Sequence, residues 1–187
     1  MLNRTSFKPF QIMESLAHKE LISAERLEER VAELAREISG DFEGIDLLTV
    51  VCVLKGAFIF TADLVRHLSL PCRIEFIRAS SYGEGRTSSG KVKLEHHETI
   101  ELEGKHVLLV EDILDTGRTL SRIVAELELQ KPASMRVCSL LDKPSRRIVP
   151  FEAHYTGFTI PDHFVVGYGL DADERYRELP FIGIENR

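Results

Sequence analysis

The stretch HVLLVEDILDTGRTLSRIVAELEL, residues 106–129, changes its character twice along its length. It begins with a nearly continuous apolar run at 106–111, which is typical of a strand buried on both faces of a sheet. A polar and acidic segment follows, and apolar residues then recur at helical spacing over about 118–129. A buried strand that leads through a short loop into a helix is the repeating part of an α/β domain.

The same alternation continues on both sides of this stretch. We expect helices at 23–39 and 57–68. Further strands are expected at 46–54, 73–79, 92–95 and 135–141. Short strands are expected at TGFTI and FVVGYGL in the glycine-rich tail. This order predicts an α/β fold, with a mainly parallel twisted sheet flanked by helices. A length of 187 residues suits one domain, 1–187.

The composition limits the classes of function. Apolar residues make up 43% and charged residues 29%, as in an ordinary globular protein, and the net charge of −6 argues against nucleic-acid or anionic-membrane binding. No apolar run approaches the ~18 residues of a membrane span, and the first residues lack the apolar stretch of a signal peptide. Cys52, Cys72 and Cys138 are far apart without metal-ligand spacing, so we expect reduced thiols, no structural zinc and a cytoplasmic location.

Polar pairs follow three of the predicted strands. They are Lys55-Gly56, Glu111-Asp112 and Asp142-Lys143. Ligands of open parallel sheets bind beyond the carboxyl ends of the strands, so these pairs should meet at one edge of the sheet.

The loop before the helix has the features of an anion site. Its amides lie at a helix start, Thr116 and Thr119 add hydroxyls, and Gly117 permits a positive φ and close approach. Neither the GxxxxGK[ST] phosphate loop nor the GxGxxG dinucleotide fingerprint is present. Three carboxylates precede the anion site, which is unexpected for a ligand that is only a phosphate.

EDILDTGRTL resembles the phosphoribosyl diphosphate (PRPP) motif of the type I phosphoribosyltransferases. An acid at the position of Asp115 is similar to the 6-oxopurine branch, the hypoxanthine-guanine enzymes, because adenine and orotate enzymes usually carry alanine there. VCVLKGAFIF, ASSYGEG, LLDKPSRR and IPDHFVVGYGLDADERYRELPFIG match that branch in the same order. The resemblance covers nearly the whole chain. It implies the type I fold, a flexible lid at about 80–95, and a hood from the N-terminal segment and about 150–187.

The resemblance also implies a reaction in purine salvage. A Mg²⁺-dependent enzyme would transfer the 5-phosphoribosyl group of PRPP to hypoxanthine or guanine, giving inosine or guanosine monophosphate and pyrophosphate. Its 5′-phosphate cradle would be Asp115, Thr116, Gly117, Arg118 and Thr119. Glu111 and Asp112 would bind the ribose, and Asp115 would also act as general base at the purine imidazole nitrogen. A sugar phosphate thus accounts for acids beside an anion site.

Other positions take their roles from the same resemblance. The pyrophosphate site would comprise Lys55, Gly56, Ser81, Tyr82 and Arg177, with a Leu54-Lys55 peptide that is often cis in the family. The purine site would comprise Lys143 at the exocyclic oxygen, Phe164 as the stacking ring and Val165 through its backbone. Asp171 would be the metal ligand, and one carboxylate suffices for Mg²⁺ that arrives with PRPP.

Two other classes of function compete with this one. A phosphoribosyltransferase-like regulator that binds RNA would share the PRPP loop, but it would not need Asp115, and the chain lacks a basic face with interleaved aromatics. A non-catalytic interaction domain would leave Asp115, Lys143, Asp171 and Arg177 unexplained. Members of the family form homodimers and homotetramers. The residues do not rank hypoxanthine, guanine and xanthine.

Overall fold

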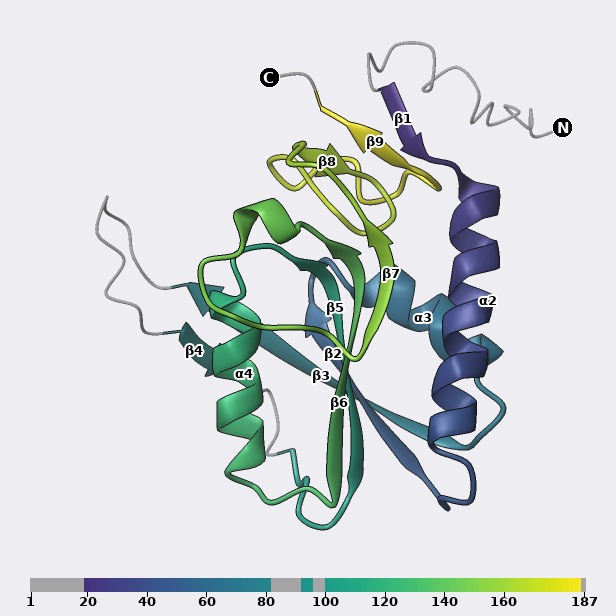
Figure 1. Cartoon of the computed structure of the whole chain (residues 1–187), viewed down its shortest axis with the longest axis vertical. Helices are drawn as coiled ribbons and strands as arrows, with labels where there is room; N and C mark the ends of the chain where they lie inside the picture. Colours follow the sequence, from purple (N-terminus) through teal and green to yellow (C-terminus); the bar gives the residue numbers. More distant parts are fainter. Residues whose placement is uncertain (1–18, 82–91, 96–99, 186–187) are drawn as a thin grey trace, which may run out of the picture.

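The computed structural model describes residues 19–81, 92–95 and 100–185 (Figure 1). Its elements, in chain order, are β1 (Lys19–Ile22), α2 (Ala24–Asp41), β2 (Leu48–Leu54), α3 (Phe58–His67), β3 (Cys72–Ser81), β4 (Val92–Glu95), β5 (His106–Leu114), α4 (Arg118–Glu128), β6 (Ser134–Asp142), the 3₁₀ turn η1 (Pro144–Arg146), β7 (Tyr155–Thr159), β8 (Val165–Val166) and β9 (Ile182–Ile184).

The main sheet has the strand order β4-β3-β2-β5-β6-β7. Neighbouring strands from β3 to β7 are parallel, while β4 pairs antiparallel with the end of β3. The mainly parallel sheet flanked by helices is therefore confirmed. The strands β2 and β5 lie in the middle, so the segments that follow them meet at the centre of one sheet edge.

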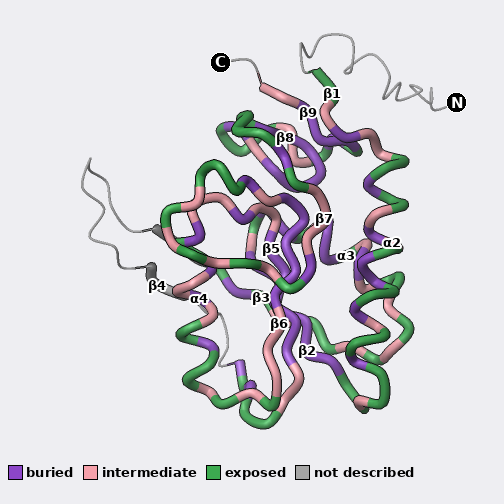
Figure 2. Tube along the Cα trace, viewed as in Figure 1, coloured by how far each residue is buried: buried purple, intermediate pink, exposed green. Residues whose placement is uncertain are grey.

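The helices cover the sheet on both faces. Along β2, Val50 packs in the core under α2 and α3, whereas the next residue, Val51, packs in the core under α4. Period-two alternation sends neighbouring side chains to opposite faces, and both faces are covered, so β2 and β5 are apolar almost throughout. Figure 2 shows these central strands as buried between the helical layers.

A second, three-stranded sheet has the order β1-β9-β8, with both pairings antiparallel. It joins the beginning of the described chain to its end, and Figure 1 shows it beyond the carboxyl ends of the main strands. The strand β7 belongs to the main sheet, so the small sheet takes only residues after Thr159 from the expected range 150–187.

Two differences from the sequence-based expectation concern the site. The strand β5 does not end at Glu111 but runs on to Leu114, because Ile113 and Leu114 continue the parallel ladder with β6. FVVGYGL forms only the two-residue strand β8, since Gly167, Tyr168 and Gly169 all have positive φ. Most of the predicted lid lies outside the described residues. In the described part of the chain, no helix combines the length and apolarity that a membrane crossing needs.

Candidate active site

A cavity of about 350 Å³ opens beyond the carboxyl ends of β2 and β5. It brings together most of the predicted site residues: Lys55, Gly56, Glu111, Asp112, Asp115, Thr116, Gly117, Thr119, Asp171 and Arg177. Larger hollows of about 510 and 660 Å³ lie elsewhere, and their linings contain none of the predicted residues. The convergence of charged groups, rather than size, therefore identifies the candidate site.

The phosphate-binding loop turns at Gly117, which has a φ of +80° and precedes the first turn of α4. A Cβ at this position would lie 2.5 Å from the backbone oxygen of Val149, so both the dihedral and the packing require glycine. The helix start directs unpaired amides and the positive end of its dipole at the cavity. Arg118 does not line the cavity, although its amide donates to Thr116 Oγ1 at 3.4 Å.

Glu111 and Asp112 form a pair of adjacent carboxylates, of which Glu111 is buried and Asp112 is half-buried. The backbone amide of Asp112 donates to Glu111 Oε1 at 3.1 Å. Burial, together with the neighbouring Asp112 carboxylate, raises the pKa of Glu111 well above its usual value. Burial also raises the pKa of Asp112, although its hydrogen bonds and the charge of Arg177 oppose the rise. Carboxylates whose charge is disfavoured by burial in this way favour a ligand that supplies hydroxyl donors.

The segment after β2 packs against Asp112 without any intervening side chain. The Leu54-Lys55 peptide is cis, the form that is frequent in the family that the sequence resembles. A Cβ on Gly56 would overlap the Asp112 carboxylate, and a Cβ on Gly169 would overlap the Gly56 carbonyl. Glycine at 56 and 169 therefore lets three chain segments meet at the cavity floor.

The C-terminal loop contributes charges that are paired with one another. Arg177 Nη2 lies 2.8 Å from Asp171 Oδ1, and the amide of Glu174 donates to Asp171 Oδ2 at 2.9 Å. The Glu174 carboxylate pairs with Lys55 Nζ at 2.7 Å. Among the described residues, no three carboxylates, histidines or cysteines gather closely enough to hold a metal by themselves. A Mg²⁺ ion at Asp171 would take its other ligands from phosphate oxygens and water, which is its common habit.

The three predicted purine residues, Lys143, Phe164 and Val165, are not part of the cavity lining. Lys143 is 8% exposed, its amide donates to the Leu114 carbonyl at 3.0 Å, and its Nζ donates to the His163 carbonyl at 2.5 Å. Burial lowers the pKa of this lysine. Phe164 is 39% exposed, and Val165 is buried in β8. Lys143 therefore connects the end of β5, through its amide, to the segment at His163, through its side chain.

Ser81 is the last residue of β3 and pairs with Val92 across to β4. Tyr82 lies outside the described residues.

Sequence reasoning missed two arginines beside the loop. Arg146 Nε donates to Asp115 Oδ1 at 3.0 Å, and its Nη1 lies 3.5 Å from Asp162 Oδ2. Arg147 donates to the carbonyl groups of Leu114 and Asp115. Read alone, KPSRR is only a short basic run, and nothing local marks partners that lie about thirty residues earlier.

Comparisons with known proteins agree with this geometry. Residues 18–173 match the phosphoribosyl transferase domain family model. The hypoxanthine phosphoribosyltransferase of Haemophilus influenzae is 48% identical over 165 residues, which cover 87% of this chain and 92% of that protein. The hypoxanthine-guanine phosphoribosyltransferase of Mycobacterium avium is 47% identical over 169 residues, covering 87% of this chain and 83% of that protein.

Solved structures show the same fold. A crystal structure of a hypoxanthine-guanine phosphoribosyltransferase from Bacillus anthracis superposes with a TM-score of 0.85 at 49% identity, covering 90% of this chain and 98% of that one. The fold and the family resemblance predicted from the sequence are both confirmed. The chain belongs to the phosphoribosyltransferase family.

Proposed function

We propose that this protein transfers the 5-phosphoribosyl group of PRPP to hypoxanthine or guanine, forming the nucleoside monophosphate and pyrophosphate in purine salvage. One observation carries the proposal. A single cavity combines an anion-binding helix start, adjacent carboxylates, and the basic groups Lys55 and Arg177. That sequence of groups matches a ligand with a phosphate, a sugar and a second, larger anion.

We assign the 5′-phosphate to the backbone amides of residues 115–119, namely Asp115, Thr116, Gly117, Arg118 and Thr119, and to the two threonine hydroxyls. The helix start and the positive φ of Gly117 support this assignment. The ribose hydroxyls are assigned to Glu111 and Asp112. Their carboxylates accept hydrogen bonds, and they stabilise the positive charge that the sugar develops in the transition state.

Pyrophosphate is assigned to the Lys55-Gly56 segment and Arg177, with Ser81 and Tyr82 as predicted contacts from the lid. Mg²⁺ enters with PRPP as part of the substrate and neutralises the leaving group, and Asp171 is its proposed protein ligand. Among the described residues, the buried Nε atom of Arg177 has no hydrogen-bond partner, which is compatible with an arginine whose donors are not all used within the protein.

The purine is assigned to Lys143, Phe164, Val165 and Asp115. A purine nitrogen forms its bond to C1′ while the C1′–O bond to pyrophosphate breaks, and pyrophosphate leaves with the electron pair. The Asp115 carboxylate accepts the proton from the imidazole N–H. Phe164 stacks on the ring, and backbone groups of Val165 bind the purine edge.

Lys143→Gln tests the choice of base. An ammonium donor favours a 6-oxo acceptor over a 6-amino group, so the preference for hypoxanthine over adenine should fall about tenfold, the loss expected for one charged hydrogen bond. The measurement is the ratio of kcat/KM for the two bases. An unchanged ratio would remove the assigned role of Lys143.

Steady-state kinetics with the purified protein test the whole proposal. PRPP, Mg²⁺ and each of hypoxanthine, guanine, xanthine and adenine are supplied in turn, and nucleotide formation is measured. We expect turnover with hypoxanthine or guanine that depends on both PRPP and Mg²⁺. No turnover with either base, together with tight binding of RNA, would favour the regulator instead.

The assembly, the hood and the location complete the proposal. Phe58, Ile74 and Phe76 are large apolar side chains exposed on α3 and on the adjoining face of β3, which supports a homodimer or homotetramer. The small sheet is assigned the role of a hood over the purine site. Cys52 and Cys138 are buried free thiols, in keeping with the reducing cytoplasm.

A further inference from the structure

Three successive carbonyl groups at the start of the phosphate-binding loop have hydrogen-bond partners in one later segment, residues 147–149. Leu114 O accepts from Arg147 Nη1 at 3.1 Å, and Asp115 O accepts from the same nitrogen. Thr116 O accepts from the amides at 148 and 149, each at 3.0 Å. Three successive carbonyls therefore point at a wall made by one arginine side chain and the backbone that follows it.

This arrangement fixes where the amides point. In a planar trans peptide the carbonyl and the next N–H point in opposite directions. Carbonyls of Leu114, Asp115 and Thr116 that face the wall place the amides of Asp115, Thr116 and Gly117 on the other side of the loop. That side is the cavity, whose lining includes all of these residues. Three oriented amides then act with the start of α4 as an anion nest.

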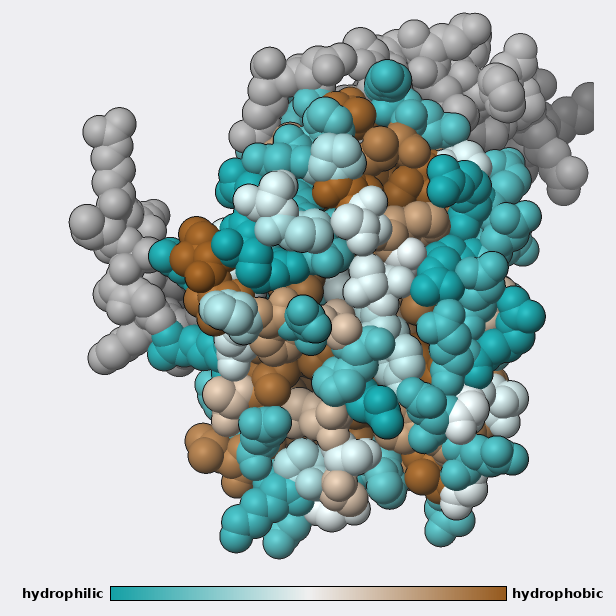
Figure 3. All heavy atoms as spheres, viewed as in Figure 1, coloured by the Kyte–Doolittle hydropathy of each residue, from teal (hydrophilic) through white to brown (hydrophobic). Residues whose placement is uncertain are grey.

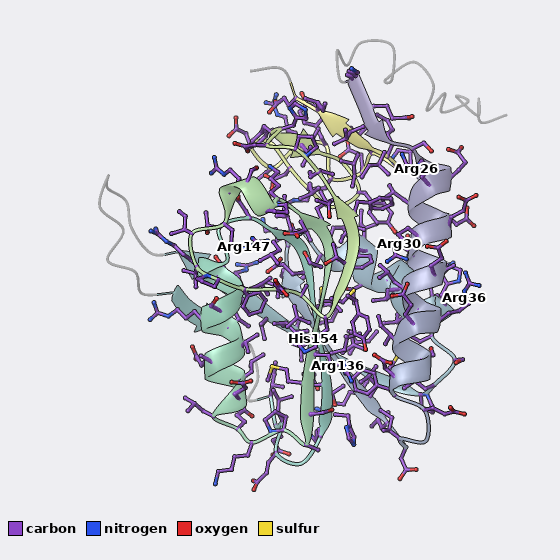
Figure 4. The ribbon with its side chains drawn as sticks, in the orientation of Figure 1. Arg26, Arg30, Arg36, Arg136, Arg147 and His154 are labelled. Carbon is purple, nitrogen blue, oxygen red and sulfur yellow. The ribbon has the colours of Figure 1, made fainter. Side chains whose placement is uncertain are left out.

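The wall packs directly against the loop. A Cβ on Gly117 would approach Arg147 Cδ to 3.2 Å as well as the Val149 oxygen. The guanidinium is itself anchored, because Arg147 Nη2 pairs with the carboxylate of Asp142 at the end of β6. The Arg147 side chain is only 16% exposed. Figure 4 shows it near the beginning of α4, on the other side of the molecule from Arg36.

We propose that Arg147 is a positioning residue for substrate binding: it holds the loop carbonyls from behind and so presents the loop amides to the 5′-phosphate of PRPP. The inference rests on the proposed function. The guanidinium bridges the end of β5, the loop and the end of β6 with one rigid fork, which a lysine cannot reproduce because its ammonium is a single point donor. Arg147 acts through the loop and does not touch the substrate.

The test separates positioning from stability. Replacing Arg147 alone leaves the half-buried Asp142 without its cation, which destabilises the protein whatever the role of the arginine. The informative protein is therefore the double variant Arg147→Met/Asp142→Asn, with Arg147→Lys as the conservative change. Arg36→Met on α2 is the matched control, since Arg36 is exposed and its side chain donates only to the Ala32 carbonyl of its own helix.

Two probes report on the two ends of the cavity. Ribose 5-phosphate carries the 5′-phosphate without pyrophosphate, and pyrophosphate with Mg²⁺ occupies the other end; both affinities are measured by calorimetry. In the double variant we expect the Kd for ribose 5-phosphate and the KM for PRPP to rise at least about tenfold, because misplaced groups bind and react poorly. The Kd for pyrophosphate should stay within about twofold. Arg147→Lys should lie between the double variant and the wild type.

A general loss of structure would weaken both probes together, and a wall without influence on the amides would leave both unchanged. Equal weakening of both probes, or no change in either, overturns the role of Arg147. Turnover of PRPP by the wild type tests the proposed function separately, so failure of that assay and failure of this inference are distinguishable.

Discussion

The phosphate-binding loop at 114–119 and the C-terminal loop at 167–177 both line the cavity, but they are held in different ways. The first is fixed through its backbone, by the β5–β6 ladder, the helix α4 and the wall at 147–149. The backbone hydrogen bonds of the second loop stay within residues 167–179, for example from the Gly169 amide to the Arg177 carbonyl at 2.9 Å. Its tie to the segment after β2 includes the Lys55–Glu174 ion pair, whose side chains are 48% and 65% exposed.

The backbone φ angles of the two loops also differ. The first loop needs a positive φ only at Gly117, where glycine adopts it without strain. In the second loop Tyr168, Asp173, Glu174 and Tyr176 have positive φ, which surrounding contacts must maintain. Exposed ion pairs contribute little stability. We therefore expect the 5′-phosphate end of the cavity to be formed in advance, and the pyrophosphate end to be completed by the substrate.

Asp115→Asn should have the largest effect. The amide keeps the shape of the side chain in a well-held loop but cannot accept the purine proton, so kcat should fall about 100-fold or more while the KM for PRPP changes little. Steady-state kinetics with hypoxanthine measure both parameters. A fall in kcat of less than about twofold would show that Asp115 is not the general base.

Gly56→Ala should come next. Its Cβ would overlap the Asp112 carboxylate and push the ribose-binding groups out of place, and displacement of such groups by about 1 Å can cost about 100-fold in kcat/KM. Gly40→Ala in α2 is the matched control, because nothing lies within 4 Å of the added methyl group and activity should be unchanged. Normal activity of Gly56→Ala would mean that the residues at the cavity floor can shift to make room for the added methyl group.

The difference between the two loops also explains what sequence alone could predict. The first loop follows from local pattern: an apolar run, acids, Gly117 and a periodic helix are contiguous, and the strand, the glycine turn and the helix all form. Even here the predicted end of β5 was wrong. The acids suggested the end of a strand, whereas pairing of Leu114 with Asp142 on β6, a non-local contact, extends it.

The rest depends on partners that are distant in the sequence. The roles of Arg146 and Arg147 depend on partners about thirty residues earlier, and the pairing of β1 with β9 joins the two ends of the described chain. The shortness of β8 results from the positive φ of Tyr168, which no propensity of tyrosine predicts. Such features arise from tertiary packing and become visible only in the structure.

Glu111→Gln should stabilise the free protein while reducing activity. The pKa of Glu111 is raised by burial, so the folded state disfavours its charge, and stability is lost as the pH rises through that pKa. The neutral amide of glutamine does not carry this cost. A gain of about 1 kcal/mol in the free energy of unfolding would raise Tm by about 2–4 °C at pH 7. The difference should vanish near pH 4, where the wild-type carboxyl is protonated too. Equal Tm values at both pH values would contradict the cost of this buried charge.

Glu174→Gln should have the smallest effect. The change removes an exposed carboxylate that pairs with Lys55 at 2.7 Å and with Arg177 at 3.5 Å, so the stability of the protein should change little. With Lys55 released toward pyrophosphate, the KM for PRPP should fall about twofold at low salt and return to the wild-type value at about 1 M salt, where charges are screened beyond about 3 Å. Glu33→Gln, which loses an exposed pair with Arg30 on α2, is the matched control and should leave the KM unchanged. A tenfold rise in KM for Glu174→Gln would instead show that ion pairs hold the second loop as firmly as backbone contacts hold the first.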